Sequence, residues 1–262
     1  MSVCTGAVIG AFVLALAIPW MRSRQEQTAP PAPTVISNPS VPRSAGPLAN
    51  FGDETPSHDA RHVANWAFFT GDNQGKSVVL LDKAARVYTF DPSGRLVAAT
   101  PALLGSAIGD DSAPGISDKP LAQIRPKEKT THAGRFEAQP GVNTDGENVI
   151  WIDYDAAVSM HRVRPTVAAE RRFERVATPT EEDNRVSFSC VNLPMHFYDQ
   201  ALSPAVKKTE AIVYVRPETR TPQEVFGSWD VTDPTQTRVA SAVRTKESAA
   251  APAPAARRIR DQ

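Results

Sequence analysis

The sequence predicts a mainly β domain, a β-sandwich or β-barrel that carries one or two short helices. Two observations predict this fold class: many short runs rich in β-branched and aromatic residues, and few segments with helical character. A third observation bounds the domain, because Pro and Ala crowd into both ends of the chain. We therefore expect an apolar N-terminal helix over residues 1–21, a Pro-rich linker over 22–65, the folded domain over 66–218 and a disordered tail over 219–262.

The N-terminal segment from Val3 to Met21 carries no charge. As a helix it would span about 28 Å, which is close to the thickness of a bilayer core. It fits either an uncleaved membrane anchor or a signal peptide with a small-x-small cleavage site at residues 15–17. Arg22 and Arg24 follow the segment and no basic residue precedes it, which by the positive-inside rule would keep the rest of the chain in the cytoplasm. The chemistry inferred below favours export instead, to the periplasm or the outer face of the cytoplasmic membrane.

The folded region divides into strand candidates separated by turns. The strand candidates are 77–82, 85–90, 95–104, 134–138, 148–154, 157–163, 185–190 and 211–216. Residues 91–94, Asp-Pro-Ser-Gly, have Pro and Gly in the positions that a turn prefers. The helix candidates are 194–206, with Pro194 near its first turn, and 166–176. A series of short strands with few helices is typical of a sandwich or barrel.

Charge and cysteine content limit the classes of function. The chain has 29 Lys plus Arg and 29 Asp plus Glu, so it has no general attraction for polyanions and we expect no nucleic-acid partner. It has two cysteines, Cys4 in the apolar segment and Cys190 in the folded region. A disulfide between them would join a membrane segment to a core, and we exclude it. Cys190 is therefore a lone thiol, and a lone thiol with a histidine elsewhere in the chain is a candidate nucleophile.

A histidine near the end of a predicted strand, His161, is the best-placed base for this thiol. A thiol is a good acyl-transfer nucleophile only as a thiolate, and a nearby imidazole favours that ionisation. Because His161 precedes Cys190, the order disfavours papain-like folds, in which the cysteine comes first. The other four histidines show no metal-ligand spacing with cysteines or acid pairs, so we expect neither a metal nor another cofactor.

The order of elements from about 77 to 216 resembles the catalytic domain of the L,D-transpeptidases, also called the YkuD domain. The matching features are a strand pair at 78–82 and 86–91, a turn at Gly94, a strand ending at Gly105, a Thr-x-x-Gly-x-Phe element at 131–136, the strand histidine His161, the segment Ser-Phe-Ser-Cys-Val-Asn at 187–192, a helix and a final Val-rich strand at 212–215. This resemblance covers over half of the chain, and the order of its elements is more specific than any single motif.

The resemblance implies acyl transfer on the stem peptides of peptidoglycan through a thioester on Cys190, with His161 as the base. It also implies a support for each reacting group. Backbone N–H groups of Ser189 and Cys190 would stabilise the tetrahedral oxyanion, and the carbonyl of Arg162 would orient the imidazole. Ser187 and Asn192 would hold the turn by hydrogen bonds. The membrane would be a second partner if the N-terminal segment stays uncleaved.

Three departures from the family pattern stand out. Ser189 replaces a Gly, so its side chain could strain the turn or narrow the oxyanion site. His132 replaces a Pro in the 131–136 element, with less expected consequence. The gap between His161 and Cys190 is long, and the insertion around 170–184 could form a lid or rim, with Arg171 and Arg172 on a solvated helix face.

The departure at Ser189 motivates a second hypothesis, a catalytically impaired protein that binds peptidoglycan or serves as a scaffold on the same fold. A third hypothesis is a cytoplasm-facing anchored protein, which follows from Arg22 and Arg24.

Overall fold

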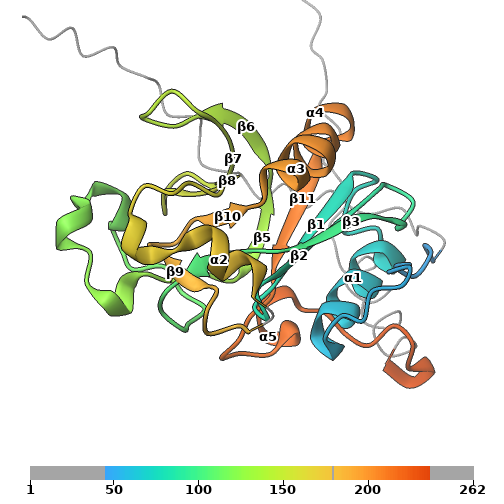
Figure 1. Ribbon diagram of the computed structural model, residues 1–262. Coiled ribbons are helices and arrows are strands. Elements are labelled where there is room, and N and C mark those ends of the chain that lie inside the picture. The colour runs from blue at the N-terminus through green and yellow to red at the C-terminus, as the bar shows by residue number, and fades with distance from the viewer. Residues whose placement is uncertain (1–44, 179, 237–262) are drawn as a thin grey trace, which may run out of the picture. The chain divides into compact units, whose positions relative to one another are not determined.

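The computed structural model describes residues 45–178 and 180–236 (Figure 1). The expected apolar segment 1–21, most of the expected linker and the end of the expected tail lie outside the described residues. Among the helices of the described ranges, none is both long and apolar enough to cross a membrane.

The largest sheet has five strands in the order β3-β2-β1-β11-β5. Their bounds are Ser77–Asp82 for β1, Arg86–Phe90 for β2, Leu96–Pro101 for β3, Gly134–Glu137 for β5 and Ala211–Val215 for β11. The central strand β1 pairs in parallel with β11, and the other neighbours in this sheet are antiparallel. The first and last strands of the domain therefore lie side by side at its centre.

A second sheet has four strands in the order β10-β8-β7-β6, and β4 and β9 form a small third sheet. Their bounds are Leu104–Gly105 for β4, Gln139–Val142 for β6, Asn148–Asp153 for β7, Val158–Arg162 for β8, Arg185–Ser187 for β9 and Val191–Leu193 for β10. Within the described residues, three sheets with few, short helices confirm the prediction of a mainly β fold.

The five-stranded sheet is buried on both faces, which explains why β1 is apolar at nearly every position. Val79 and Leu81 face a core that contains Ile150 and Met160 of the four-stranded sheet. The intervening Val78 and Leu80 face a second core together with residues of the first helix. The alternation along one strand thus separates two cores, and the four-stranded sheet lies over only one of them.

The first helix, α1 (His58–Thr70), supplies the second core. Its boundaries follow local signals: the Ser57 side chain accepts a hydrogen bond from the Ala60 N–H, and Gly71 ends the helix with a φ of 71°. Val63 and Ala64 are fully buried. α1 therefore begins inside the range expected to be linker, and α5 (Pro222–Phe226) lies in the range expected to be tail.

The helix predicted over 194–206 is confirmed as a continuous series of turns. It comprises α3 (Met195–Phe197), the π-helical turn η5 (Tyr198–Leu202) and α4 (Ser203–Thr209). The helix predicted over 166–176 is found in two short pieces, η4 (Ala168–Glu170) and α2 (Arg172–Ala177). Three single 3-10 turns, η1 (Ile116–Asp118), η2 (Leu121–Gln123) and η3 (Pro126–Glu128), lie in the long connection from β4 to β5.

Candidate active site

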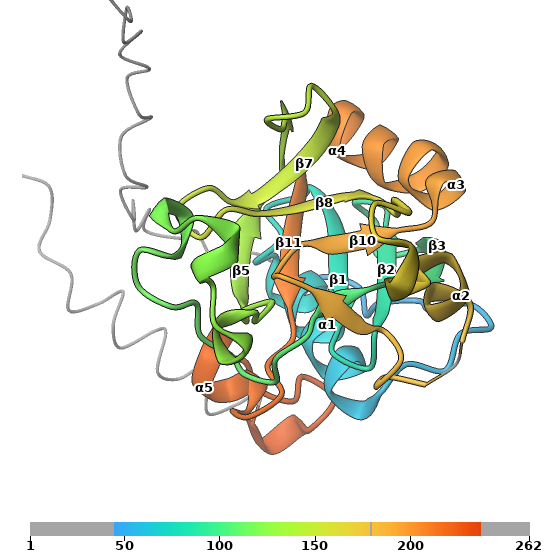
Figure 2. The ribbon, with the colours of Figure 1, turned by 60° about the vertical axis from the view of Figure 1, so that its left-hand side comes forward.

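Cys190 immediately precedes β10, and its side chain lies against the neighbouring strand β8. The two strands run side by side and parallel (Figure 2). Their register pairs Val191 with Met160 and Asn192 with His161. Because side chains alternate along a strand, Met160 points into the core while the residues on either side of it face the opposite way. One of these is Ser159, whose hydroxyl oxygen lies 3.7 Å from the Cys190 sulfur. The other is His161, so the strand pairing brings the predicted base to the predicted nucleophile.

The imidazole of His161 has a defined tautomer. Its Nδ1 lies 2.9 Å from the carbonyl oxygen of Arg162, and a carbonyl can only accept, so Nδ1 carries the proton. The same carbonyl was the one expected from the sequence to orient the ring. Nε2 is then free to accept a proton, and His161 and Cys190 are close enough to shift each other's pKa.

The two groups shift each other's ionisation toward an ion pair. Burial opposes ionisation of the Cys190 thiol, but the hydrogen bond and charge of His161, with the N–H and hydroxyl of Ser159, lower its pKa. Burial likewise opposes the charged form of His161, yet the Cys190 thiolate and the Arg162 carbonyl raise the pKa of the imidazole. As a whole residue, Cys190 is half-buried.

The turn that presents Cys190 is held by hydrogen bonds to its carbonyl groups. Ser187 donates its hydroxyl proton to the Cys190 carbonyl at 2.6 Å, and the Asn192 amide donates to the same oxygen at 3.2 Å. Thr131 donates to the carbonyl of Ser189 at 2.7 Å and accepts from the N–H of Gly105 at 2.8 Å. A Cβ at Gly105 would lie 2.4 Å from the Lys129 carbonyl oxygen, so only glycine permits this approach.

With the carbonyls satisfied, the backbone N–H groups of Ser189 and Cys190 have no acceptor among the described residues. Ser189 is also absent from the non-glycine residues of positive φ in the described ranges. Ser189 therefore does not adopt the left-handed φ that would favour glycine, so the backbone shows no sign of the strain expected at this position.

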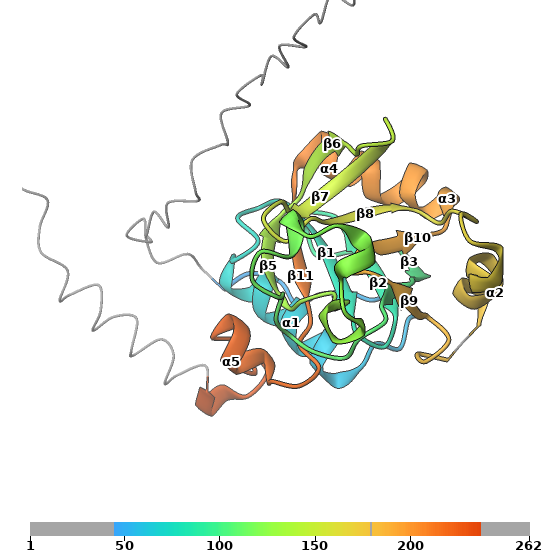
Figure 3. The ribbon, with the colours of Figure 1, turned by 90° about the vertical axis from the view of Figure 1, so that its left-hand side faces the viewer.

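The position of the Arg172 side chain differs from the one expected from the sequence. Its guanidinium was expected on a solvated helix face, but its side chain is only 11% exposed and reaches inward. It donates to the side-chain oxygen of Asn192 at 2.9 Å, and it also pairs with Glu170. Its neighbour Arg171, at 69% exposure, does lie in solvent. Figure 3 shows α2, which carries Arg172, standing outside β9 and β10, so the insertion between β8 and β9 forms one rim of the site.

The structure thus brings together all six residues expected at the site. Arg162 contributes through its carbonyl, while its guanidinium pairs with Asp199 and lies over the Tyr198 ring at 4.2 Å. Sequence reasoning missed Ser159, although the period of two residues before His161 could have found it. It also missed Ala157, whose carbonyl oxygen lies 3.7 Å from the Cys190 sulfur.

Two aromatic residues lie beyond Ser159 on the same sheet. Trp151 stands opposite Ser159 in the antiparallel register of β7 and β8, so both side chains are on the face that carries the site. Its ring contacts that of Tyr154 at 4.6 Å, and Tyr154 is 67% exposed. This pair is therefore accessible from solvent at Tyr154, while Trp151 is half-buried.

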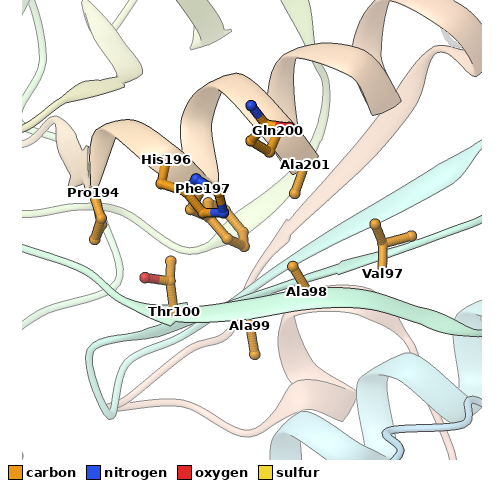
Figure 4. A pocket seen from close by; sticks show the side chains of 9 residues that line it. All are labelled: Val97, Ala98, Ala99, Thr100, Pro194, His196, Phe197, Gln200 and Ala201. Carbon is orange, nitrogen blue, oxygen red and sulfur yellow. The ribbon is translucent and has the colours of Figure 1, made fainter.

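Other features of the described residues do not touch Cys190. No group of three or more His, Cys, Asp or Glu side chains in the described ranges could hold a metal ion. A mainly apolar pocket of about 330 Å³ lies between β3 and the α3–η5 helix, and it is lined by Val97, Ala98, Ala99, Thr100, Pro194, His196, Phe197, Gln200 and Ala201. Figure 4 shows Phe197 pointing from the helix toward the strand across this pocket.

Comparison with known proteins finds no protein-family model that matches the sequence, and no curated protein that does. Among solved structures, the helical cell shape determining protein Pgp2 from Campylobacter jejuni is 13% identical, over 56% of this chain and 49% of that one, with a TM-score of 0.37. A point mutant of Pgp2 is 14% identical, over 56% and 48%, with a TM-score of 0.36. An L,D-transpeptidase from Xylanimonas cellulosilytica is 14% identical, over 53% and 60%, with a TM-score of 0.32.

The chain thus spans about half the length of the two Pgp2 chains. At these identities and TM-scores the likenesses assign no activity to the chain.

Proposed function

We propose that the chain is a cysteine acyltransferase of the L,D-transpeptidase type, which acts on peptidoglycan stem peptides. The observation that carries this proposal is the His161–Cys190 pair, in which the thiol pKa is lowered beside two backbone N–H groups without acceptors among the described residues. This combination suits an acyl-transfer nucleophile better than a structural cysteine, which needs neither a base nor oxyanion donors. The order of elements along the chain supports the substrate class.

The proposed reaction is acyl transfer in two steps. The Cys190 thiolate attacks the carbonyl carbon of a stem residue joined to a D-amino acid, and the Ser189 and Cys190 N–H groups stabilise the oxyanion. The imidazolium of His161 protonates the leaving amine as the C–N bond breaks, which leaves a thioester on Cys190. An amine acceptor, or water, then loses a proton to His161 and attacks the thioester. The first acceptor gives a cross-link and the second a carboxypeptidase product.

Thioester formation on the full-length protein tests the proposal. The protein is incubated with a tetrapeptide stem that ends in an L,D bond, and its intact mass is followed with a carbapenem as a second acylating agent. We expect an acyl adduct on the wild type and none on Cys190→Ala. The same peptide with an L,L terminus is the matched substrate control and should give no adduct. Absence of adducts from both reagents on the wild type would refute the enzyme.

The same experiment separates the alternative of a non-catalytic binding or scaffold protein. That protein would sediment with isolated peptidoglycan and yet form no adduct.

The proposed location, the periplasm or outer face of the cytoplasmic membrane, requires export directed by the apolar N-terminal segment. A periplasm-dependent reporter fused to the C-terminus should be active; a silent reporter from a stable fusion would favour the cytoplasm-facing protein.

A further inference from the structure

Two adjacent residues, Thr131 and His132, contact two different groups near Cys190. Thr131 binds the carbonyl of Ser189 at 2.7 Å, while Nε2 of His132 lies 2.8 Å from a carboxylate oxygen of Asp153. We propose that His132, acting through Asp153, is a positioning residue that sets the Cys190 sulfur against the oxyanion donors. This inference rests on the proposed function, since it concerns the geometry of acyl transfer.

The His132 ring is fixed by its surroundings. The residue is 7% exposed, and its ring packs edge-to-face on Phe136 at a centroid distance of 5.2 Å. Its Nδ1 is buried and has no hydrogen-bond partner among the described residues. A tautomer with the proton on Nε2 fits this environment, because it donates to Asp153 and leaves no buried N–H without an acceptor.

Asp153 connects the fixed His132 ring to the turn between β7 and β8 by hydrogen bonds. One carboxylate oxygen accepts from His132, and the other accepts from the backbone N–H of Ala156 at 3.0 Å. The hydrogen bond from His132 overcomes partial burial and lowers the pKa of Asp153, so the carboxylate is an ionised, strong acceptor. The next residue, Ala157, has a φ of 53°, and its carbonyl oxygen accepts a hydrogen bond from the Cys190 thiol at 3.7 Å.

Thr131 fixes the other half of the geometry. A trans peptide unit is planar, with its C=O and N–H pointing in opposite directions. When Thr131 holds the carbonyl of Ser189, the N–H of Cys190 in the same peptide unit is therefore directed away from Thr131. Residues 131 and 132 are one peptide apart, so a single short segment locates both the oxyanion donor and the contact that orients the sulfur.

Two reagents separate positioning from simple thiol reactivity. With p-nitrophenyl acetate, the thiolate forms a C–S bond to the acetyl carbon through an oxyanion, and p-nitrophenolate leaves. With iodoacetamide, the thiolate displaces iodide directly and no oxyanion forms. Acetylation therefore depends on both the sulfur and the N–H groups, whereas alkylation depends on the thiolate alone. Neither reagent resembles a stem peptide, so the comparison does not depend on the natural substrate.

His132→Phe keeps a buried ring beside Phe136 but removes the donor to Asp153. We expect acetylation of the full-length protein to fall on the order of tenfold, the kind of loss that follows a small misplacement of reacting groups. Alkylation at the same pH should stay near the wild-type rate. The matched variant His132→Gln places an amide N–H near the position of Nε2 and should restore acetylation.

The proposal is overturned if His132→Phe slows both reactions equally, slows neither, or only lowers the unfolding temperature. It is also overturned if Gln fails to restore acetylation in a folded protein. Should the Phe variant not fold, Asp153→Ala at the turn tests the same link with the same two reagents. A wild type that acetylates normally but forms no adduct with stem peptides would refute the proposed function. The ratio of the acetylation rate to the alkylation rate in the His132 variants would still test positioning by His132.

Discussion

Arg172 donates a hydrogen bond to the side-chain oxygen of Asn192, 2.9 Å away, and so links the inserted helix α2 to the strand that follows Cys190. Both residues are largely shielded from solvent, because Asn192 is fully buried and the Arg172 side chain is 11% exposed. The charge of Arg172 also opposes protonation of His161, although less than the Cys190 thiolate favours it. The insertion therefore affects the chemistry of the site as well as its rim.

Replacing Arg172 tests both effects. In Arg172→Met, loss of the positive charge should raise the pKa of His161 further, which an NMR titration of the ring measures. Loss of the donor leaves the buried Asn192 oxygen unpaired, which should lower the free energy of unfolding by about 1–3 kcal/mol in urea titrations. The exposed neighbour gives the control, since Arg171→Met should change neither quantity. A titration of His161 identical in all three proteins would contradict the electrostatic link.

The second prediction concerns the pH dependence of Cys190. Because its pKa is lowered, alkylation by iodoacetamide should persist as the pH falls below the usual thiol range and decline only through the lowered value. In His161→Gln the favourable charge is absent, so the profile should move to higher pH. At a pH below the thiol pKa of both proteins, the variant should react about tenfold more slowly for each pH unit that separates the two profiles. His196 is exposed and lies in another pocket, so His196→Gln should match the wild type.

The lowered pKa of Cys190 and the raised pKa of His161 both make the stability of the fold depend on pH. The stabilisation from the lowered Cys190 pKa is complete above the thiol's unfolded pKa and is lost as the pH falls through the folded value. The stabilisation from the raised His161 pKa is complete below its unfolded pKa and is lost as the pH rises through the folded value. The unfolding temperature of Cys190→Ala should therefore vary less with pH, over the range in which Cys190 and His161 titrate, than the unfolding temperature of the wild type.

The third prediction addresses the residue before the nucleophile. Since Ser189 does not have a positive φ, glycine at this position relieves no strain. Ser189→Gly should instead lower the free energy of unfolding by about 0.4–1 kcal/mol, because glycine adds freedom to the unfolded chain. Acetylation by p-nitrophenyl acetate should be unchanged. A clear increase in that rate would mean that the serine side chain obstructs the oxyanion site, in favour of an impaired enzyme.

A fourth prediction concerns the charged cluster behind Thr131. Glu218 accepts hydrogen bonds from Lys83 at 3.4 Å, from the Gly109 N–H at 2.7 Å and from Arg185. Lys83 is 1% exposed, and its ammonium also donates to the carbonyl of Thr131. Glu218→Ala leaves two buried cations without their carboxylate and should cost about 3–5 kcal/mol of unfolding free energy in urea. Glu174→Ala removes only a solvent-exposed pair and should leave stability unchanged.

The strands were predictable where their hydrophobic pattern extends over five or six residues, as in β1 and β11. The candidate 185–190 shows the limit, because the structure ends β9 at Ser187 and begins β10 at Val191. Distant contacts cause the interruption: Ser106 donates to the Ser187 carbonyl and Thr131 to that of Ser189. No local property of residues 188–190 indicates that the chain leaves the strand there.

The helix α1 is a different case, since its signals are local. Ser57 and Gly71 are residues that commonly begin and end helices, and they bracket it. The Pro-rich segment before it led to a linker being expected through residue 65.

At the site, Cys190 and His161 were predictable from residue type and order. Asp153 and Arg172 were not, because they come near the site through strand register and through an insertion that no spacing in the sequence reveals.

The parallel pairing of β8 with β10 has a consequence for how such a site can diversify. Parallel neighbours require a long crossover, and here that crossover contains η4, α2 and β9. The ladder between the two strands sets the approach of His161 to Cys190, whatever the length of the loop that joins them. Exchange of residues 164–184 would thus change the rim and remove the Arg172 contact to Asn192, while the register keeps Asn192 opposite His161. The strand register and the crossover therefore make separate contributions to the site: the first fixes which residues face each other, and the second adds the Arg172 contact and charge.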